Sequence, residues 1–499
     1  MTRTPTSTTW HRLRLSFHGA AGMVTGSKHL LTLDGTRTLL DAGLFQGGRH
    51  LRRLNWESAG FSPRAVDQVL VSHTHIDHIG YLPRLVREGL DAPVHLTPAA
   101  YDLAELALLD SAKIQEEDAR YARKKGYSRH DPALPLYTTE DAEKALGLRR
   151  RLPYGEWLGL TGDEAGNGGP RARARFLNSG HLLGAAFVEV HVEPPAGSSR
   201  TSPLRIVYSG DVGRFEMPLH LDPRPLPACD VLVIESTYGD RDHPDTPILD
   251  QIREPFAHTL SQGGTVLIPA FAVGRSQQLT LILRRLMLRG ELPEVPIHID
   301  SPMAVDATDI YSRFLDPHNL DADVFEDGRL RLFPEDVSFH RSVADSKRLN
   351  DLPGPRILIS SSGMLSGGRV LHHLKRLAPD PDNLLMLAGY QAEGTRSRAL
   401  LDGADAVKVH GRWIPVRCRV MSLQGLSGHA DREELLCWVG SAPEPPRVAF
   451  LVHGEPRSAA ALARELRRRL DIRTFTPELD EDVDLWDLLG PGLPGPEFP

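Results

Sequence analysis

The sequence His73-Thr74-His75-Ile76-Asp77-His78 gathers three imidazoles and a carboxylate directly after the apolar run Val69-Leu70-Val71. Residues two apart on an extended chain point to the same side, so His73, His75 and Asp77 can converge while His78 reaches round from the next position. Imidazole and carboxylate ligands without a thiolate suit zinc, or a similar divalent ion used for hydrolysis, more than a structural zinc knuckle. The alternative is a polar loop with scattered histidines, but burying so many titratable groups without a metal would be costly.

The length and composition of the chain predict more than one domain. At 499 residues, of which 40% are hydrophobic, the chain is too long for one simple core, so we expect two domains, one of them interrupted by the other. The three cysteines are few, odd in number and far apart, which argues against a disulfide framework and for a reducing compartment. No stretch qualifies as a secretion signal or a membrane span, so we expect a soluble, cytoplasmic protein with no membrane partner.

The charge distribution is compatible with an anionic partner. The formal net charge of −7 is mildly acidic, yet basic residues cluster at 120–125, 149–151, 171–175 and 408–419. Only eight of the 58 basic residues are lysines, and arginine is the residue that makes bidentate contacts to phosphate. A local basic groove matters more than the total charge when a nucleic-acid strand is bound. The alternative is an arginine-rich genome whose charged faces are solvated.

The first 240 residues alternate short apolar runs with turns, which is the pattern of β-strands. Strands are expected at 13–17, 29–33, 38–40, 68–72, 94–96, 173–177, 186–192, 204–208 and 231–234. A polar, periodic segment at 97–125 predicts a helix with Ala104, Leu108 and Ala112 on one stripe. The glycine-rich stretch 155–171 has the composition of a loop and predicts a surface insertion.

Between residues 241 and 426 the pattern changes to strands that alternate with helices. Strands are expected at 265–269, 297–299, 356–359 and 384–387, each followed by a helical or turn segment. Such alternation predicts an α/β domain with a parallel sheet and covering helices. After a strand at 447–452 and a helix at 458–470, the acidic, Pro-rich and Gly-rich end of the chain predicts a flexible tail.

Four further apolar runs are followed by a residue that can bind a metal. These residues are Asp41, His181, Asp211 and His453, each close to a glycine that lets the backbone approach closely. Singly, each is explained equally well as a capping Asp or as a strand-end His with a satisfied hydrogen bond. Together with the motif at 73–78 they supply the ligands of two metals.

These motifs resemble the signature of the metallo-β-lactamase superfamily, in which an Asp, the pattern HxHxDH, a lone His and a lone Asp follow in order. Three more motifs resemble those of the β-CASP nucleases: Ile234-Glu235-Ser236-Thr237-Tyr238-Gly239, Ser427-Gly428-His429-Ala430-Asp431 and Val452-His453-Gly454-Glu455. The resemblance covers residues 13–470 and implies an α/β protein. It would be a four-layer αββα sandwich, the metallo-β-lactamase fold, with an inserted β-CASP domain that contains a parallel sheet. The implied divisions are 1–240 and 427–475 for the sandwich, 241–426 for the insertion and 476–499 for the tail.

The resemblance also implies two zinc ions per chain, with manganese as an alternative. One ion would bind His73, His75 and His181, the other Asp77, His78 and His453, and Asp211 would bridge both. Asp41 would orient ligands or the bridging solvent from just outside. Two such ions lower the pKa of a bridging water and neutralise the charge that grows in an in-line displacement, so hydrolysis of a phosphodiester is the implied reaction.

The catalytic residues that the resemblance implies are Asp77, Asp41, Glu235 and His429. The leaving ribose oxygen needs a proton, and the family assigns that task to the histidine matching His429, held by the carboxylate matching Glu235. A hydrogen-bonded Glu would raise the pKa of the imidazole and keep it protonated near neutrality. The alternative for Glu235 is a strand-end acid that pairs with Arg241.

Single-stranded RNA is the implied partner. RNA-processing members carry a His where DNA-specific members typically carry Val, and His453 matches that position, while Ser427 matches a serine that contacts phosphate. Two glycine-containing turns that open helices are further candidates, because backbone N–H groups at helix starts attract anions. Their candidate residues are Arg275, Ser276, Ser361, Ser362, Gly363 and Arg369. The alternative for each turn is that it binds nothing, as many strand-to-helix turns do, and whether the protein forms a homodimer is left open.

The expected function is a zinc-dependent ribonuclease, an endonuclease, a 5′ exonuclease or both, acting in RNA processing or decay. A metallo-hydrolase of a small molecule is the second hypothesis, but it would not explain the long insertion together with Glu235, His429 and His453. A DNA nuclease of the same superfamily and a catalytically silent RNA-binding homologue are further alternatives. The silent homologue is disfavoured because no ligand position is missing.

Overall fold

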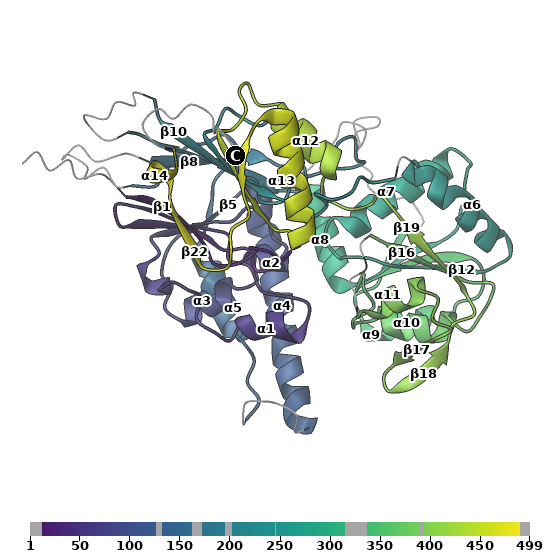
Figure 1. The fold of residues 1–499 in the computed structure, drawn as a ribbon. Helices are drawn as coiled ribbons and strands as arrows, with labels where there is room; N and C mark the ends of the chain where they lie inside the picture. Colours follow the sequence, from purple (N-terminus) through teal and green to yellow (C-terminus); the bar gives the residue numbers. More distant parts are fainter. Residues whose placement is uncertain are drawn as a thin grey trace, which may run out of the picture. The chain divides into compact units, whose positions relative to one another are not determined.

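The computed structural model describes residues 12–125, 132–161, 172–194, 202–244, 246–314, 337–389, 391 and 394–489. The chain divides into two compact units. Unit 1 contains Met1–Gly213, Pro223–Asp242 and His429–Pro499, and unit 2 contains Arg214–Asp222 and His243–Gly428 (Figure 1). Unit 2 is therefore inserted into the sequence of unit 1, and the short segment 214–222 also belongs to it. Among the described residues, every helix is too short or too polar to span a lipid bilayer.

Unit 1 contains two seven-stranded sheets. The first sheet consists, in spatial order, of β22 (Glu481–Asp484), β1 (Leu13–Phe17), β2 (His29–Leu33), β3 (Thr36–Leu40), β4 (Gln68–Leu70), β5 (Val94–Leu96) and β6 (Arg149–Arg151). The second consists of β21 (Arg473–Phe475), β20 (Val448–Val452), β11 (Val231–Glu235), β10 (Leu204–Tyr208), β9 (Ala186–Val192), β8 (Ala172–Asn178) and β7 (Leu158–Gly159). Strands β3 to β6 run parallel in the first sheet, as do β10, β11, β20 and β21 in the second.

The apolar core of unit 1 lies between these two sheets. Leu13, Leu15 and Phe17 of β1 alternate with partly exposed residues and point into this core. There they join Phe176 of β8 and Phe450 of β20 in one cluster of buried side chains. Strands β11 and β20 are buried along their whole length, as expected of parallel strands that are covered on both faces.

Helices cover the outer faces of the two sheets and complete four layers. The helical segments of the first half are α1 (Arg49–Leu54), the 3-10 turn η1 (Pro63–Ala65), α2 (Ile76–Ile79), α3 (Leu82–Arg87), α4 (Pro98–Lys125) and α5 (Thr139–Gly147). Ala104, Leu108 and Ala112 form the predicted buried stripe of α4 and pack with residues of β3, β4 and β5. On the second sheet, Trp438 of α12 (Arg432–Gly440) packs against Phe187 of β9, and α13 (Pro456–Leu470) packs on β20.

Unit 2 contains a six-stranded sheet in which all neighbouring strands are parallel. In spatial order the strands are β14 (Val337–Phe339), β13 (Ile297–Asp300), β15 (Arg356–Ser360), β12 (Thr265–Pro269), β16 (Leu384–Ala388) and β19 (Arg419–Leu423). Its helices are α6 (Ile248–Ser261), α7 (Arg275–Leu288), α8 (Pro302–Arg313), α9 (Val343–Leu349), α10 (Val370–Leu377) and α11 (Arg396–Leu401). A two-stranded ribbon, β17 (Ala406–Val409) and β18 (Arg412–Pro415), completes it. The parallel sheet predicted for residues 241–426 is thus present.

The C-terminal part of the chain differs from the expected flexible tail. Strand β22 pairs antiparallel with β1, and α14 (Leu485–Leu489) buries Leu485 and Leu489 in the core of unit 1. The expectation is therefore wrong for residues 481–489, while residues 490–499 lie outside the described residues. The reason is that β22, with the sequence EDVD, is an edge strand held by its backbone, so its side chains show no apolar alternation. Of the expected insertion at 155–171, Leu158–Gly159 forms β7 and 162–171 lie outside the described residues.

Candidate metal centre

The predicted metal ligands all come together in unit 1, at the ends of its strands. His73 follows β4, Asp211 follows β10 and His453 follows β20. Because β10, β11 and β20 run parallel, their carboxyl ends meet at one edge of the second sheet. The single turn of α2 presents Asp77 and His78, with His75 as its N-cap residue.

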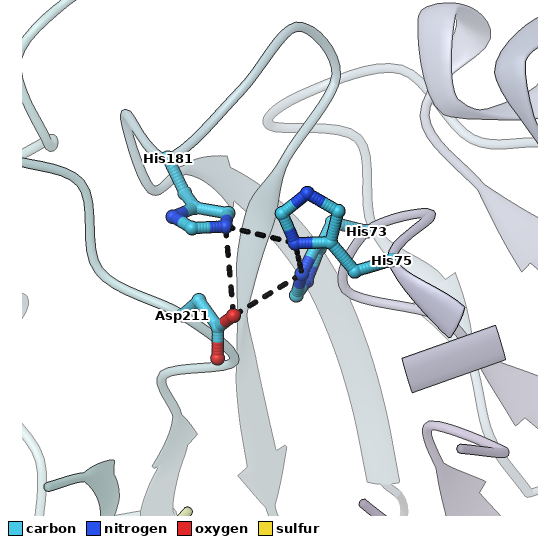
Figure 2. A group of neighbouring side chains, drawn as sticks. All are labelled: His73, His75, His181 and Asp211. Atoms are coloured by element: carbon cyan, nitrogen blue, oxygen red, sulfur yellow. Dashed lines mark hydrogen bonds and ion pairs between the residues drawn. The ribbon is translucent and has the colours of Figure 1, made fainter. Parts of the chain in front are cut away.

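The first group of ligand atoms contains three imidazoles and one carboxylate (Figure 2). His75 Nδ1 lies 3.1 Å from His73 Nε2 and 3.1 Å from His181 Nε2. Asp211 Oδ2 lies 3.2 Å from His73 Nε2 and 3.5 Å from His181 Nε2. All four side chains point toward one common point, where a cation could be bound.

The second group contains Asp77, His78 and His453. His453 Nε2 lies 3.1 Å from His78 Nε2 and 3.5 Å from Asp77 Oδ2. The other oxygen of Asp211, Oδ1, lies 3.2 Å from His78 Nε2. Asp211 therefore offers one carboxylate oxygen to each group, which is the position predicted for a bridging ligand.

The spacing of these atoms fits a divalent metal better than it fits hydrogen bonding. Ligands about 2.0–2.1 Å from a tetrahedral zinc ion are about 3.3–3.4 Å from one another, close to the distances of 3.1–3.5 Å in both groups. The buried atom Asp211 Oδ1 has no hydrogen-bond partner among the described residues. A buried carboxylate oxygen without a donor is costly unless a cation compensates it.

The protonation states also favour a bound cation. Burial lowers the pKa of His75 to about 3 and lowers those of His73 and His181, so these three rings are neutral at neutral pH and can act as ligands. Burial opposes the charged form of His78, but the carboxylates of Asp211 and Asp41 outweigh it and raise its pKa well above the usual value. The carboxylates of Asp211 and Asp41 therefore favour a positive charge beside His78.

Asp41 contacts the outer nitrogen of the His78 ring. Its buried carboxylate lies 2.7 Å from His78 Nδ1, which leaves His78 Nε2 facing Asp211 and His453. Ser72 donates to it from the backbone N–H at 2.6 Å and from Oγ at 2.7 Å, and the Tyr208 hydroxyl donates at 2.6 Å. A carboxylate that fixes the outer nitrogen of a ligating histidine sets both its tautomer and its orientation.

Glu235 and His429 form the second predicted pair. His429 Nδ1 lies 3.0 Å from Glu235 Oε2, and the backbone N–H of Val212 donates to Glu235 Oε1 at 2.6 Å. Thr237 Oγ1 donates to Glu235 Oε2 at 2.6 Å and lies 3.1 Å from His453 Nδ1. The alternative partner of Glu235, Arg241, pairs instead with its neighbour Asp240. Glu235 thus orients the His429 ring, and Thr237 connects this pair to the metal ligand His453.

Three supporting residues were not predicted: Ser72, Tyr208 and Thr237. Ser72 precedes the HxHxDH motif and Thr237 lies within the quoted motif 234–239, so both had a positional signal. Tyr208 had none, because a tyrosine at the end of an apolar strand is most simply explained as a core residue. Its hydroxyl points at Asp41 only because β10 and β3 face each other across the sandwich.

The predicted phosphate-binding residues belong to unit 2. The Arg369 guanidinium donates to Asp300 at 2.7 Å and to the carbonyls of His340 and Arg341, so it already has three internal partners. Ser276 Oγ donates to the Phe271 carbonyl, Ser361 Oγ donates to Ser301, and Ser362 Oγ bonds to Ser366. Arg275 donates to Gln278, Gly363 lies against the Phe271 ring, and Ser427 is buried. Their role in phosphate binding stays a prediction.

Three family models match the chain in succession. They are the Metallo-beta-lactamase superfamily at residues 26–232, the Beta-Casp domain at 276–400 and the Zn-dependent metallo-hydrolase RNA specificity domain at 413–477. The chain is 40% identical over 459 residues to Ribonuclease TTHA0252 of Thermus thermophilus, covering 92% of this chain and 96% of that protein. It is 30% identical over 483 residues to Transcription termination factor FttA of Methanocaldococcus jannaschii, covering 93% of this chain and 70% of that protein.

A solved structure of low sequence similarity shares the fold. It is the crystal structure of a protein of unknown function from Enterococcus faecalis V583, with a TM-score of 0.51 and 12% sequence identity. The match covers 95% of this chain and 100% of that chain.

Proposed function

Because the chain belongs to the β-CASP family of the metallo-β-lactamase superfamily, we propose that it is a zinc-dependent ribonuclease that uses two metal ions. Family membership makes the chain a hydrolytic nuclease of RNA-processing type, and it confirms the predicted fold class, a metallo-β-lactamase fold with an inserted β-CASP domain. The observation that carries the proposal is the carboxylate of Asp211, whose two oxygens face two separate groups of ligands.

Several observations support RNA as the substrate. The third family model is described as an RNA specificity domain, one relative is named a ribonuclease and the other a transcription termination factor. His453 supports RNA over DNA, because the resemblance associates a histidine at this position with RNA processing. Its ring contacts both the second ligand group and Thr237. We propose that the protein acts as an endonuclease, a 5′ exonuclease or both, in RNA processing or decay.

We assign the metal ligands as the two groups described above, with Asp211 shared between them. When bound, two divalent ions supply Lewis acidity, a water of lowered pKa and compensation of the charge that develops on the phosphate. The chain itself supplies a buried cluster in which the rings of His73, His75 and His181 are neutral. Burial opposes the ionisation of Asp77, but His453 and His78 outweigh it and keep the pKa of Asp77 below its usual value. Asp77 is therefore ionised and ready to act as a ligand.

His429 is the residue that we assign to donate a proton to the leaving ribose oxygen. Glu235 holds its Nδ1, so the opposite nitrogen, Nε2, is directed away from Glu235 and can face the substrate. Glu235 has the backbone N–H of Val212 and the hydroxyl of Thr237 as further donors, which keeps its carboxylate in place. General acid catalysis by a positioned imidazole typically contributes about 10²–10⁴-fold to the rate.

The proposal also covers the domain limits, the phosphate contacts and the partner of the chain. We propose that residues 1–240 and 427–475 form the hydrolase domain and that 241–426 form the insertion. We propose Ser427 and the two turns around Arg275 and Arg369 as phosphate contacts, and single-stranded RNA as the partner. Manganese as a substitute metal, a homodimer and a cytoplasmic location remain predictions.

One assay tests the function. Purified protein with zinc or manganese is incubated with a labelled single-stranded RNA, with a DNA of the same sequence and with bis(p-nitrophenyl) phosphate, each with and without chelator. We expect cleavage of RNA that is lost with chelator and in His429→Ala at unchanged metal content. Absence of RNA cleavage by metal-loaded protein would overturn the proposal. Cleavage of the DNA alone, or of the small phosphodiester alone, would establish one of the two alternatives.

A further inference from the structure

The β17–β18 ribbon of unit 2 lies beside α10 and α11 (Figure 1) and has one buried and one exposed face. Val407 and Val409 of β17 and Ile414 of β18 point inward and pack with apolar residues of α10 and α11. Because side chains alternate along a strand, Lys408 and its cross-strand partner Trp413 point to the opposite face, and both are exposed. The outer face of the ribbon therefore presents an indole beside an ammonium group.

Trp413 has no packing role that explains its position. Its side chain is 68% exposed, more than any other large hydrophobic side chain among the described residues. Within that part of the chain no ring stacking, cation–π contact or hydrogen bond to Trp413 is found. Isolated exposed apolar residues are common, so the exposure of Trp413 alone does not indicate a binding site. The charge of the neighbouring residues must be considered with it.

Basic residues lie on the ribbon and in the segment that follows it, and the exposed acid Asp405 precedes β17. Lys408, Arg412, Arg417 and Arg419 are exposed, and none of them has a carboxylate partner within the described residues. Many other basic side chains do have one, such as Arg348, which pairs with Asp345 at 2.8 Å. Arg417 and Arg419 flank the buried Cys418, and both are exposed. A local cationic surface on a chain of net charge −7 is complementary to a polyanion.

We propose that Trp413, Lys408, Arg412, Arg417 and Arg419 form a docking surface for single-stranded RNA, here called the ribbon surface. This inference rests on the proposed function, in which RNA is the substrate. Single strands are bound by aromatic faces on which bases stack and by cations that contact the phosphates, without readout of sequence. A duplex offers phosphates but no free base faces, so the exposed indole favours a single strand. The ribbon surface would hold a part of the RNA that does not itself react, and so raise the affinity for longer substrates.

Binding of a fluorescein-labelled U20 RNA by anisotropy tests the proposal. All variants carry His429→Ala, so that the metal-loaded full-length chain binds RNA without cleaving it. We expect Trp413→Ala to raise Kd about tenfold, which is about 1.4 kcal/mol, and Trp413→Phe to stay within about twofold of the parent. The double change Lys408→Ala/Arg412→Ala should raise Kd. It should also reduce the slope of log Kd against log salt concentration by the amount expected for the loss of about one to two phosphate contacts.

Two matched controls separate the ribbon surface from general effects. Leu288→Ala removes another apolar side chain of similar exposure, 67%, and Arg348→Ala removes an exposed but paired arginine. Both should leave Kd within about twofold of the parent. In the background with intact His429, Trp413→Ala should hydrolyse bis(p-nitrophenyl) phosphate at the wild-type rate.

The possible outcomes are decisive in either direction. Equal Kd values for Trp413→Ala and the controls would overturn the inference. So would a Trp413→Ala protein that binds RNA normally but changes from dimer to monomer in sedimentation, because the ribbon surface would then be a protein interface. If the wild type binds RNA but does not cleave it, the proposed function fails, while the ratio of Kd values still decides whether the ribbon surface binds RNA.

Discussion

His429 and Glu235 lie 194 residues apart in the sequence and are joined by a 3.0 Å contact between Nδ1 and Oε2. Burial disfavours the charged imidazolium, but the carboxylates of Glu235 and Asp211 outweigh burial and raise the pKa of His429 to about 9. A protonated imidazole fixed by a buried carboxylate is suited to donate a proton at neutral pH. This pair distinguishes the site from a bare metal-binding cluster.

We predict that His429→Ala lowers kcat for RNA cleavage by about 10²–10⁴-fold, because the leaving oxygen loses its proton donor. Glu235→Gln should lower kcat less, by about tenfold, since the ring stays in place but loses its ionic partner. Glu57→Gln, a change at an exposed acid paired with Arg53, is the control and should have no effect. The rates are measured at saturating RNA, with metal content determined on the same samples. A His429→Ala enzyme with wild-type kcat would contradict this assignment.

Asp41→Asn should weaken metal binding by about 10–100-fold, because a neutral amide no longer favours the N–H tautomer of His78 that leaves Nε2 free. Tyr208→Phe removes one donor to the same carboxylate but keeps the contact between Asp41 and His78. It should therefore have a clearly smaller effect. Competition with a chromogenic chelator measures both affinities. Equal losses in the two variants would mean that Asp41 acts through general packing.

Lys28 gives a prediction for the pH dependence of stability. Its side chain is buried and donates to the carbonyls of Gly26 and Gly43, each at 2.8 Å, beside the Phe45 ring. Burial lowers the pKa of Lys28 from 10.5 to about 7 in the folded state. Between these values the unfolded chain binds a proton that the folded chain lacks, so this group makes the protein more stable as pH rises, by about 1.4 kcal/mol per unit. Below pH 7 both states are protonated and the contribution is constant.

The comparison of wild type with Lys28→Met isolates this effect. The free energy of unfolding of the wild type, relative to the variant, should increase as the pH is raised from 7 to 9. Urea titrations at pH 6, 7, 8 and 9 measure the difference, and the values at pH 6 and 7 should be nearly equal. A difference that is independent of pH over the whole range would show that the ammonium keeps its ordinary pKa.

Leu485→Ala should destabilise unit 1 by about 2–5 kcal/mol, because the side chain is fully buried between the two sheets and leaves a cavity. Leu479→Ala, an exposed position on the same C-terminal segment, is the matched control and should change the free energy of unfolding by less than about 0.5 kcal/mol. Thermal or urea unfolding measures both variants. Equal stability of Leu485→Ala and the wild type would show that α14 does not contribute to the core.

Much of the candidate site could be predicted because its ligands follow strands. His73, His75, Asp77 and His78 lie in one short motif, and Asp211 ends an apolar run whose direction is clear from the sequence. Parallel strands bring such ends to one edge of a sheet. The pattern therefore predicts that the ligand side chains lie near one another, but not the distances between their atoms. The strand pattern alone could not predict that the two oxygens of Asp211 face different groups, because that depends on one side-chain rotamer; the expected bridging role came from the family resemblance.

Other features depend on contacts between distant residues and had no signal in the sequence. Tyr208 supports Asp41 across the sandwich, and the strand Glu481–Asp484 is held by backbone pairing with β1 rather than by apolar side chains. The segment 214–222 joins unit 2 although its neighbours on both sides belong to unit 1. In each case contacts between residues distant in the sequence determine the structure, and the local composition does not predict it.

In the proposed site, side chains from distant stretches of the chain hold two metal ions with Asp211 between them. Elemental analysis of the purified protein, with metal per chain determined by mass spectrometry after dialysis against metal-free buffer, tests this most directly. We expect a value near two for the wild type and a value near one or below for Asp211→Ala. A wild-type protein that retains one ion or none, even after incubation with excess zinc, would rule out the two-metal site.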